Sequence, residues 1–179
     1  VCAIVRRGFN ASSSKAAIEV ADTTLALGLL ASYYRDLLTA KVVGITGSVG
    51  KTSCRDMIAH LLSQKFNCHS ASKSFNNHIG LPLTILNAPL NCEVLILELG
   101  TNHPGEIEYL TKIAKPDFAV ITKVAAAHIE YFGSIENVAA EKVSIRLGLK
   151  PGGKLIVNGS SSELIDYLND KRISCIEYN

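Results

Sequence analysis

The chain has 179 residues, of which 47% are hydrophobic and 19% are charged, and its formal net charge is +2. This composition excludes a disordered chain, and the length is that of one domain with an adequate core. The balanced charge gives no indication of nucleic-acid binding. The five cysteines lack CxxC spacing, which predicts reduced thiols in the cytoplasm rather than a disulfide framework or a zinc site. The longest mostly apolar stretch, residues 25–34, is too short to span a membrane.

The periodicity along the chain predicts an α/β fold. A short strand is expected at residues 3–5, and Asp22 or Thr23 can cap a helix. That helix would carry one apolar face, made of Leu30, Tyr33, Tyr34, Leu37 and Leu38. The later buried strands are expected at 42–45, 94–97, 118–121, 155–157 and 173–176, and the later helices at 54–62, 104–115, 134–149 and 163–168. Apolar strands separated by amphipathic helices predict a doubly wound, mostly parallel sheet with helices on both faces.

A glycine-rich run, GITGSVGKTS at residues 44–53, joins the strand at 42–45 to the following helix. Glycines there let backbone N–H groups turn toward an anion, and the helix start adds its positive end. The strict phosphate-loop pattern fails, because Ile45 stands where its first glycine belongs. The run nevertheless predicts a nucleotide phosphate site, with Lys51 on the β- and γ-phosphates and Thr52 on Mg²⁺. The predicted nucleotide-binding residues are Gly47, Ser48, Gly50, Lys51, Thr52 and Ser53.

Two further candidates follow the next strands, at the sheet edge where ligands bind in such folds. Glu98 ends the run VLILE and offers oxygen ligands to a hard cation that bridges phosphates. His128 follows a loop of small residues and could bind a second metal ion or a phosphate oxygen. The alternatives are a solvated glutamate and a structural histidine.

Lys142 occupies an unusual position in the helix expected from Ser134. The inward face of that helix is otherwise apolar: Ile135, Val138, Ala139, Ile145 and Leu149. An ammonium there is costly unless it is paired, reaches solvent, or is converted to a carbamate that could bind a metal ion. The sequence does not decide whether Lys142 is an unmodified lysine or a carbamylated one.

The segment SFNNHIGLP at residues 74–82 places two adjacent amides, Asn76 and Asn77, before an apolar helix. It is either a capped loop or a polar loop that contacts substrate across the cleft.

Together these runs resemble the ATP-dependent Mur ligase family and its phosphate-loop central domain. The matching runs are GITGSVGKTS, SFNNHIGLPLTIL, LELGTNHPGEIEYL and AHIEYFGSIENVAAEK, and the resemblance covers most of residues 18–160. The last two runs favour the member that adds D-alanyl-D-alanine to UDP-N-acetylmuramoyl tripeptide in peptidoglycan synthesis. The resemblance implies an acyl phosphate intermediate, both small molecules as substrates, and a full-length monomer.

The resemblance also implies roles for individual residues. Lys51, His128 and Lys142 would be catalytic, with Lys142 carbamylated in several members. Substrate contacts would come from Asn76 and Asn77. The metal ligands would be Thr52, Glu98, His128 and Lys142.

Two positions depart from the family pattern. Lys123 stands where Asn is usual, and Ser144 where an acidic residue is common. Residues 1–20 are expected to be the remnant of a UDP-sugar-binding domain, and residues 21–179 an incomplete central domain without its C-terminal partner. We therefore expect the chain alone to be inactive. The alternatives are a non-catalytic nucleotide-binding scaffold and a related folylpolyglutamate-type ligase.

Overall fold

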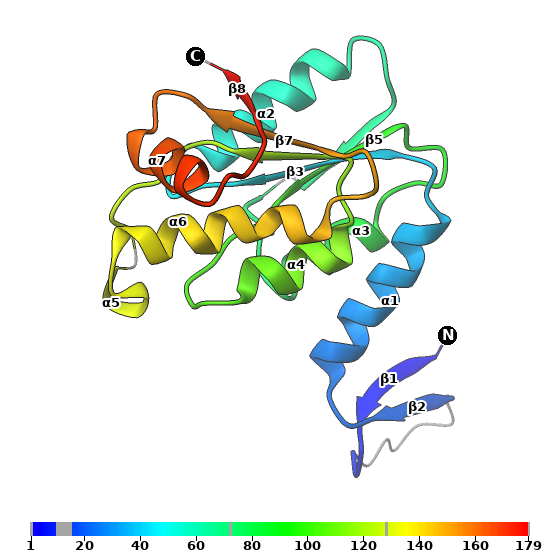
Figure 1. Ribbon diagram of the computed structural model, residues 1–179. Helices are drawn as coiled ribbons and strands as arrows, with labels where there is room; N and C mark the ends of the chain where they lie inside the picture. The colour runs from blue at the N-terminus through cyan, green and yellow to red at the C-terminus, as the bar shows by residue number, and fades with distance from the viewer. Residues whose placement is uncertain (1, 10–15, 72, 128, 179) are drawn as a thin grey trace.

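The computed structural model describes residues 2–9, 16–71, 73–127 and 129–178. The chain forms one large sheet and a small separate pair of strands (Figure 1). The large sheet contains, in spatial order, β4 (Cys68–Ser70), β5 (Val94–Glu98), β3 (Lys41–Thr46), β6 (Phe118–Ile121), β7 (Lys154–Asn158) and β8 (Ile176–Tyr178). All neighbouring strands in it pair in parallel. The predicted doubly wound parallel sheet is confirmed.

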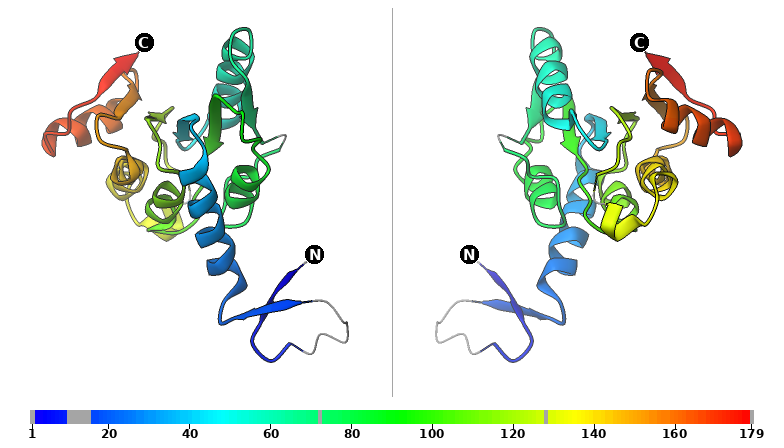
Figure 2. Two further views of the ribbon diagram at one scale, coloured as in Figure 1. Left: turned by 90° about the vertical axis from the view of Figure 1, so that its right-hand side faces the viewer. Right: turned by 90° about the vertical axis from the view of Figure 1, so that its left-hand side faces the viewer.

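The helices cover the two faces of the sheet unequally. They are α1 (Thr23–Leu37), α2 (Lys51–Leu62), α3 (Gly80–Leu86), α4 (Glu106–Ala114), α5 (Ile129–Phe132), α6 (Ile135–Val143), the 3₁₀ helix η1 (Ser144–Gly148) and α7 (Ser162–Asp170). On one face, α3, α4, α6 and α7 contribute to one large core, and α1 packs against α3 and α4. On the other face, α2 lies over β3 and β5 (Figure 2). Because β3 is central, the loop after it lies in the middle of the sheet's carboxyl edge.

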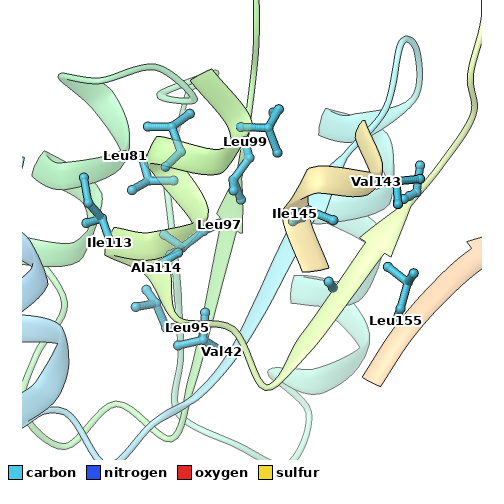
Figure 3. Packing of buried hydrophobic residues seen from close by; sticks show 14 of the residues in the cluster. Val42, Leu81, Leu95, Leu97, Leu99, Ile113, Ala114, Val143, Ile145 and Leu155 are labelled. Carbon is cyan, nitrogen blue, oxygen red and sulfur yellow. The ribbon is translucent and has the colours of Figure 1, made fainter. Parts of the chain in front are cut away.

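The central strands are buried on both sides, which explains their unbroken apolar sequences. Val42, Leu95 and Leu97 point into the larger core, where Figure 3 shows them near side chains of α3, α4 and η1. Their neighbours Val43 and Ile96 point the opposite way, into the core beneath α2. A rigid sheet of this kind fixes the positions of the loops that follow each strand.

The small pair consists of β1 (Ala3–Arg6) and β2 (Ala17–Val20), which are parallel. It lies at the far end of α1 from the large sheet (Figure 1). The expected strand at residues 3–5 is present, and β2 was not predicted.

The apolar face predicted for α1 is correct only in part, since Tyr34 and Leu38 pack against the larger core. Leu30, Tyr33 and Leu37 are exposed, whereas Gly28 and Ala31 are at most slightly exposed. Close packing explains this, because a Cβ at Gly28 would meet Ile113 of α4 at 3.1 Å. Small residues therefore take the places on the packed face that Leu30, Tyr33 and Leu37 were expected to fill.

Other element boundaries also differ from the predictions. Pro104 does not begin α4, because the chain enters that helix through Gly105 at φ 88°. The predicted Ser134 cap is confirmed, but α6 ends at Val143 and continues as η1. The last strand is β8, about three residues later than expected, and β4 is a strand that the periodicity missed.

Candidate functional site

The phosphate loop, residues 47–50, connects β3 to α2 in the predicted strand–loop–helix arrangement. Gly47 (φ 148°) and Gly50 (φ 83°) adopt backbone conformations that disfavour other residues. A Cβ at Gly47 would also collide with the hydroxyl of Thr122. Gly50 is the N-cap of α2 and offers no side-chain acceptor to its first N–H groups. Those donors therefore suit an anion such as a phosphate.

Lys51, at the start of α2, folds back onto the loop. Its Nζ donates a hydrogen bond to the carbonyl of Gly47 at 2.8 Å. Burial lowers the pKa of Lys51, and the negative charge of Glu98 opposes that shift. The ammonium is thus held at the position that a phosphate would approach.

The segment after β6 supports the phosphate loop from the other side. The hydroxyl of Thr122 donates to Val49 O at 2.6 Å, and Ser48 N donates to Lys123 O at 2.7 Å. The Ser48 hydroxyl bonds to Ala125, so its side chain is used within the protein. This role of Thr122 was not predicted, because it depends on a contact between two segments that are far apart in the sequence. The backbone contact of Lys123 does not depend on its unusual side chain.

Glu98 lies at the end of β5 and is only 3% exposed. One carboxylate oxygen accepts a hydrogen bond from the Thr52 hydroxyl at 3.2 Å. The other, Oε1, lies 2.7 Å from Arg55 Nη1 but has no aligned hydrogen bond in the described part of the chain. A buried carboxylate oxygen with unused acceptor capacity, next to a hydroxyl, fits a hard cation.

The remaining ligands of such a cation would have to come largely from elsewhere. Within the described ranges, no group of three or more His, Cys, Asp or Glu side chains gathers as a metal site. His128, the predicted second metal ligand, lies outside the described residues. Phosphate oxygens of a bound nucleotide are the natural additional ligands.

Lys142 is 3% exposed, as its place in the apolar stripe of α6 predicted. Burial is the main cause that lowers its pKa to about 8, and the positive charge of Lys51 adds to it. Glu141 and Glu106 act in the opposite direction. Ser144, the other departure, caps α6 and donates its hydroxyl to Glu141 O at 2.6 Å.

A cavity of about 630 Å³ opens beside the phosphate loop. Its lining includes Lys51, Asn76 and Asn77, so the structure brings these predicted residues together. Asn77 Oδ1 accepts hydrogen bonds from Ile79 N and Gly80 N and thereby starts α3. The capped-loop interpretation of Asn77 is correct, and the residue also lines the cavity.

The loop between β5 and α4 also lines the cavity, and the residue that anchors this loop was not predicted. Glu141 accepts hydrogen bonds from Gly105 N at 2.8 Å, Ile107 N at 2.9 Å and the Thr101 hydroxyl at 3.3 Å. Glu141 is 7% exposed and lies next to Lys142 in α6. A glutamate preceding a buried lysine gave no sequence signal for this long-range cap.

Comparison with known proteins decides the family. A family model described as the Mur ligase middle domain matches residues 45–179. The chain belongs to the Mur ligase family. Its phosphate loop, Glu98 and Lys142 all fall within the residues that this Mur ligase model matches.

Individual Mur ligases resemble the chain closely. The UDP-N-acetylmuramoyl-tripeptide--D-alanyl-D-alanine ligase of Bacillus subtilis is 45% identical over 150 residues, which cover 84% of this chain and 33% of that protein. A structure of MurF from Acinetobacter baumannii has a TM-score of 0.89 at 31% identity and covers 98% of this chain and 39% of that one. A structure of MurF from Thermotoga maritima in complex with ADP has a TM-score of 0.84 at 32% identity. It covers 94% of this chain and 39% of that one.

The chain spans about a third of the length of the curated Mur ligases it matches. No helix in the described ranges combines the length and apolar character needed to cross a membrane.

Proposed function

We propose that this chain is the ATP-binding part of a cytoplasmic ligase that adds D-alanyl-D-alanine to UDP-N-acetylmuramoyl tripeptide. One observation carries the proposal: the cavity is lined both by Lys51 of the phosphate loop and by the amides Asn76 and Asn77. A phosphoryl donor and a polar acceptor can therefore meet in one space. The similarity to Mur ligases that bear this activity in their names supports the choice of substrates.

The reaction would proceed in two steps. The peptide carboxylate attacks the γ-phosphorus of ATP, which forms an acyl phosphate and releases ADP. The amine of D-alanyl-D-alanine then attacks the acyl carbon, and phosphate leaves as the amine loses a proton. Lys51, freed from the Gly47 carbonyl, would stabilise the charge on the transferring phosphoryl group. Backbone N–H groups of the loop and of the first turn of α2 would hold the neighbouring phosphates, with Ser53 contributing through its amide. Ser48 would shape the loop, because its amide and hydroxyl bond to Lys123 and Ala125.

Thr52 and Glu98 would hold Mg²⁺, because their oxygens are adjacent and Glu98 Oε1 has spare acceptor capacity. The cation would neutralise negative charge on the phosphates when bound. His128 and Lys142 are proposed as ligands of a second cation. Lys142 is buried and close enough to Lys51 to be affected by its charge, which supports its assignment to the same site.

A carbamate on Lys142 is part of this proposal. Carbon dioxide adds to a neutral amine with release of one proton, and a pKa of about 8 leaves part of the Lys142 population neutral near pH 7. Nuclear magnetic resonance in ¹³C-bicarbonate should show a carbamate signal that is absent in Lys142→Met. A spectrum without that difference would leave Lys142 a plain buried lysine.

The domain assignment remains part of the proposal. Residues 1–20 would belong to a UDP-sugar-binding domain and residues 21–179 to the central domain, in a protein that is monomeric at full length. The position of β1 and β2 beyond α1, apart from the large sheet, supports a boundary near residue 20.

Calorimetric titration with a non-hydrolysable ATP analogue and Mg²⁺ tests the nucleotide site. We expect Lys51→Ala to weaken binding by about 100-fold or more, because a charge-assisted contact to phosphate is lost, and to leave the fold intact. Lys65→Ala, which changes an exposed lysine just beyond α2, is the matched control. Equal binding by both variants would refute the assigned phosphate site.

A second assay separates the ligase from the alternatives. The full-length gene product should release phosphate only when UDP-N-acetylmuramoyl tripeptide and D-alanyl-D-alanine are both present. Nucleotide binding without any such release would favour a scaffold. Release with glutamate and a folate instead would favour a folylpolyglutamate-type ligase.

A further inference from the structure

A buried arginine lies between the proposed cation site and the wall of the cavity. Arg55 is 4% exposed and is the buried residue of α2, whose other side chains are partly or fully exposed. Placing a guanidinium on the inward face of a helix is costly unless its donors find partners. Its partners therefore indicate what the residue does.

One nitrogen of Arg55 contacts two different parts of the site. Nη1 donates a hydrogen bond to the carbonyl of Lys73 at 2.9 Å and lies 2.7 Å from Glu98 Oε1. The contact with Glu98 lacks hydrogen-bond alignment, whereas the contact with Lys73 has it. On the outer side, Nε and Nη2 both donate to Asp56, which is exposed and keeps Nη1 turned inward.

The Lys73 carbonyl begins the segment that carries the cavity amides. Asn76 O accepts a hydrogen bond from Gly100 N at 2.7 Å, two residues after Glu98. A Cβ at Gly100 would lie 2.7 Å from Asn76 Cγ, so the two segments are in close contact. The segment 73–80 is thus held by Arg55 at one end, by Gly100 in the middle and by the Asn77 cap at the other.

We propose that Arg55 is a positioning residue that couples the cation site at Thr52 and Glu98 to segment 73–80, of which residues 76–78 line the cavity. This inference rests on the proposed function, because it requires the cation site. A cation at Glu98 takes up negative charge that otherwise attracts Arg55. Nη1 is then held chiefly by Lys73 O, and segment 73–80 becomes more ordered. By thermodynamic reciprocity, a ligand that orders the segment also strengthens cation binding.

Amide hydrogen exchange, compared in ADP alone and in ADP with Mg²⁺, tests the coupling in this chain. In the wild type we expect Mg²⁺ to slow exchange across residues 73–80 by about fivefold, the lower end of usual coupling factors. In Arg55→Met this Mg²⁺ effect should disappear, and Arg55→Lys should restore part of it. Arg146→Met, an equivalent change at an exposed arginine of η1, should leave the effect unchanged.

The Mg²⁺ concentration that half-maximally enhances ADP binding is the second readout. Arg55→Met should lower it by about fivefold, because no internal cation then competes for Glu98. A merely structural arginine would loosen the segment equally with and without Mg²⁺ and would not lower this midpoint. If Arg55→Met fails to fold, Arg55→Gln serves instead, since it keeps a donor for Lys73 O without the charge.

The outcomes separate this inference from the proposed function. An unchanged Mg²⁺ effect in Arg55→Met, or a higher midpoint, overturns the coupling while the nucleotide site stands. ADP binding that Mg²⁺ does not influence overturns it as well. A wild-type chain that binds no ADP under any condition overturns both proposals.

Discussion

Two buried arginines lie at opposite ends of the strands of the large sheet, and they have different surroundings. Arg35 of α1 is at the edge where β3 and β6 begin, and Arg55 of α2 is at the edge where β5 ends. Both are at most 4% exposed, and each approaches a carboxylate. The difference lies in how completely their partners are satisfied.

The Arg35 cluster is closed. Its guanidinium donates to the carbonyls of Ala114, Leu38 and Lys115 at 3.0 to 3.3 Å and lies 3.6 Å from Asp117. Asp117 in turn accepts hydrogen bonds from Val42 N and from the Lys41 side chain, both at 2.9 Å. Every partner belongs to the fold itself, so this cluster joins α1 to the start of the sheet and nothing more.

The Arg55 cluster is open. Within the described residues, Glu98 keeps an oxygen without an aligned donor, and Thr52 donates to its other oxygen. The same pair of residue types thus serves the fold where its hydrogen bonds are complete and marks a candidate site where they are not. Completeness of hydrogen bonding, rather than burial, distinguishes the two.

The largest expected effect tests this distinction through stability. Arg35→Met should lower the free energy of unfolding by about 3–5 kcal/mol, because it takes the buried donor from three carbonyls and removes the positive charge beside Asp117. Arg55→Met should cost less than half as much, since Asp56 is exposed and Glu98 keeps its hydrogen bond from Thr52. Urea denaturation of both variants measures the difference. Equal losses would mean that the two clusters are equally structural.

A smaller effect concerns the carboxylate of the closed cluster. Burial alone would raise the pKa of Asp117, but hydrogen bonds from Lys41 and Val42 N outweigh it and hold the pKa below its usual value. A depressed pKa stabilises the fold above the unfolded-state pKa of about 3.9, and that stability is lost as the pH falls through the folded-state pKa. Asp117→Asn should therefore cost about 1.5–3 kcal/mol at pH 7 and progressively less below about pH 4.

Measuring the free energy of unfolding from pH 7 to pH 2 checks the direction of this pH dependence. The curves of the wild type and Asp117→Asn should converge in acid. A constant gap between them would show that Asp117 contributes through packing rather than through its charge. Asp170→Asn, at an exposed surface pair, should follow the wild type throughout.

The parts of the fold and site that the sequence predicted are those with local causes. Apolar runs predicted the central strands, glycine spacing predicted the phosphate loop, and a helical stripe predicted the burial of Lys142. These signals depend on residues within one or two turns of each other. The resemblance to Mur ligases added roles that the pattern alone left open.

The parts that were missed depend on partners far away in the chain. Arg35 is buried because carbonyls 79 and 80 residues later accept its hydrogen bonds, and it lies on the packed side of α1, which was expected to be apolar. Arg55 meets Glu98 and Lys73 only once the sheet has formed. Single-sequence periodicity contains no information about such carbonyls, so a charged residue there reads as solvent-exposed.

The smallest expected effect comes from a third buried charge, which lies beside the candidate site and yet has complete hydrogen bonds. Glu141 accepts from Gly105 N, Ile107 N and the Thr101 hydroxyl. If a buried charge with complete hydrogen bonds serves only the fold, Glu141→Gln should lower the free energy of unfolding by about 1 kcal/mol, the value of one hydrogen bond. It should change ADP affinity by less than about twofold.

Glu136→Gln, at an exposed position of the same helix, is the matched control and should change neither quantity. Denaturation and calorimetry on the two variants give both readings. A large loss of ADP affinity in Glu141→Gln with unchanged stability would contradict the comparison. Proximity to Lys142 would then matter more than satisfied hydrogen bonds, and Glu141 would belong with Arg55 among the residues that serve the site.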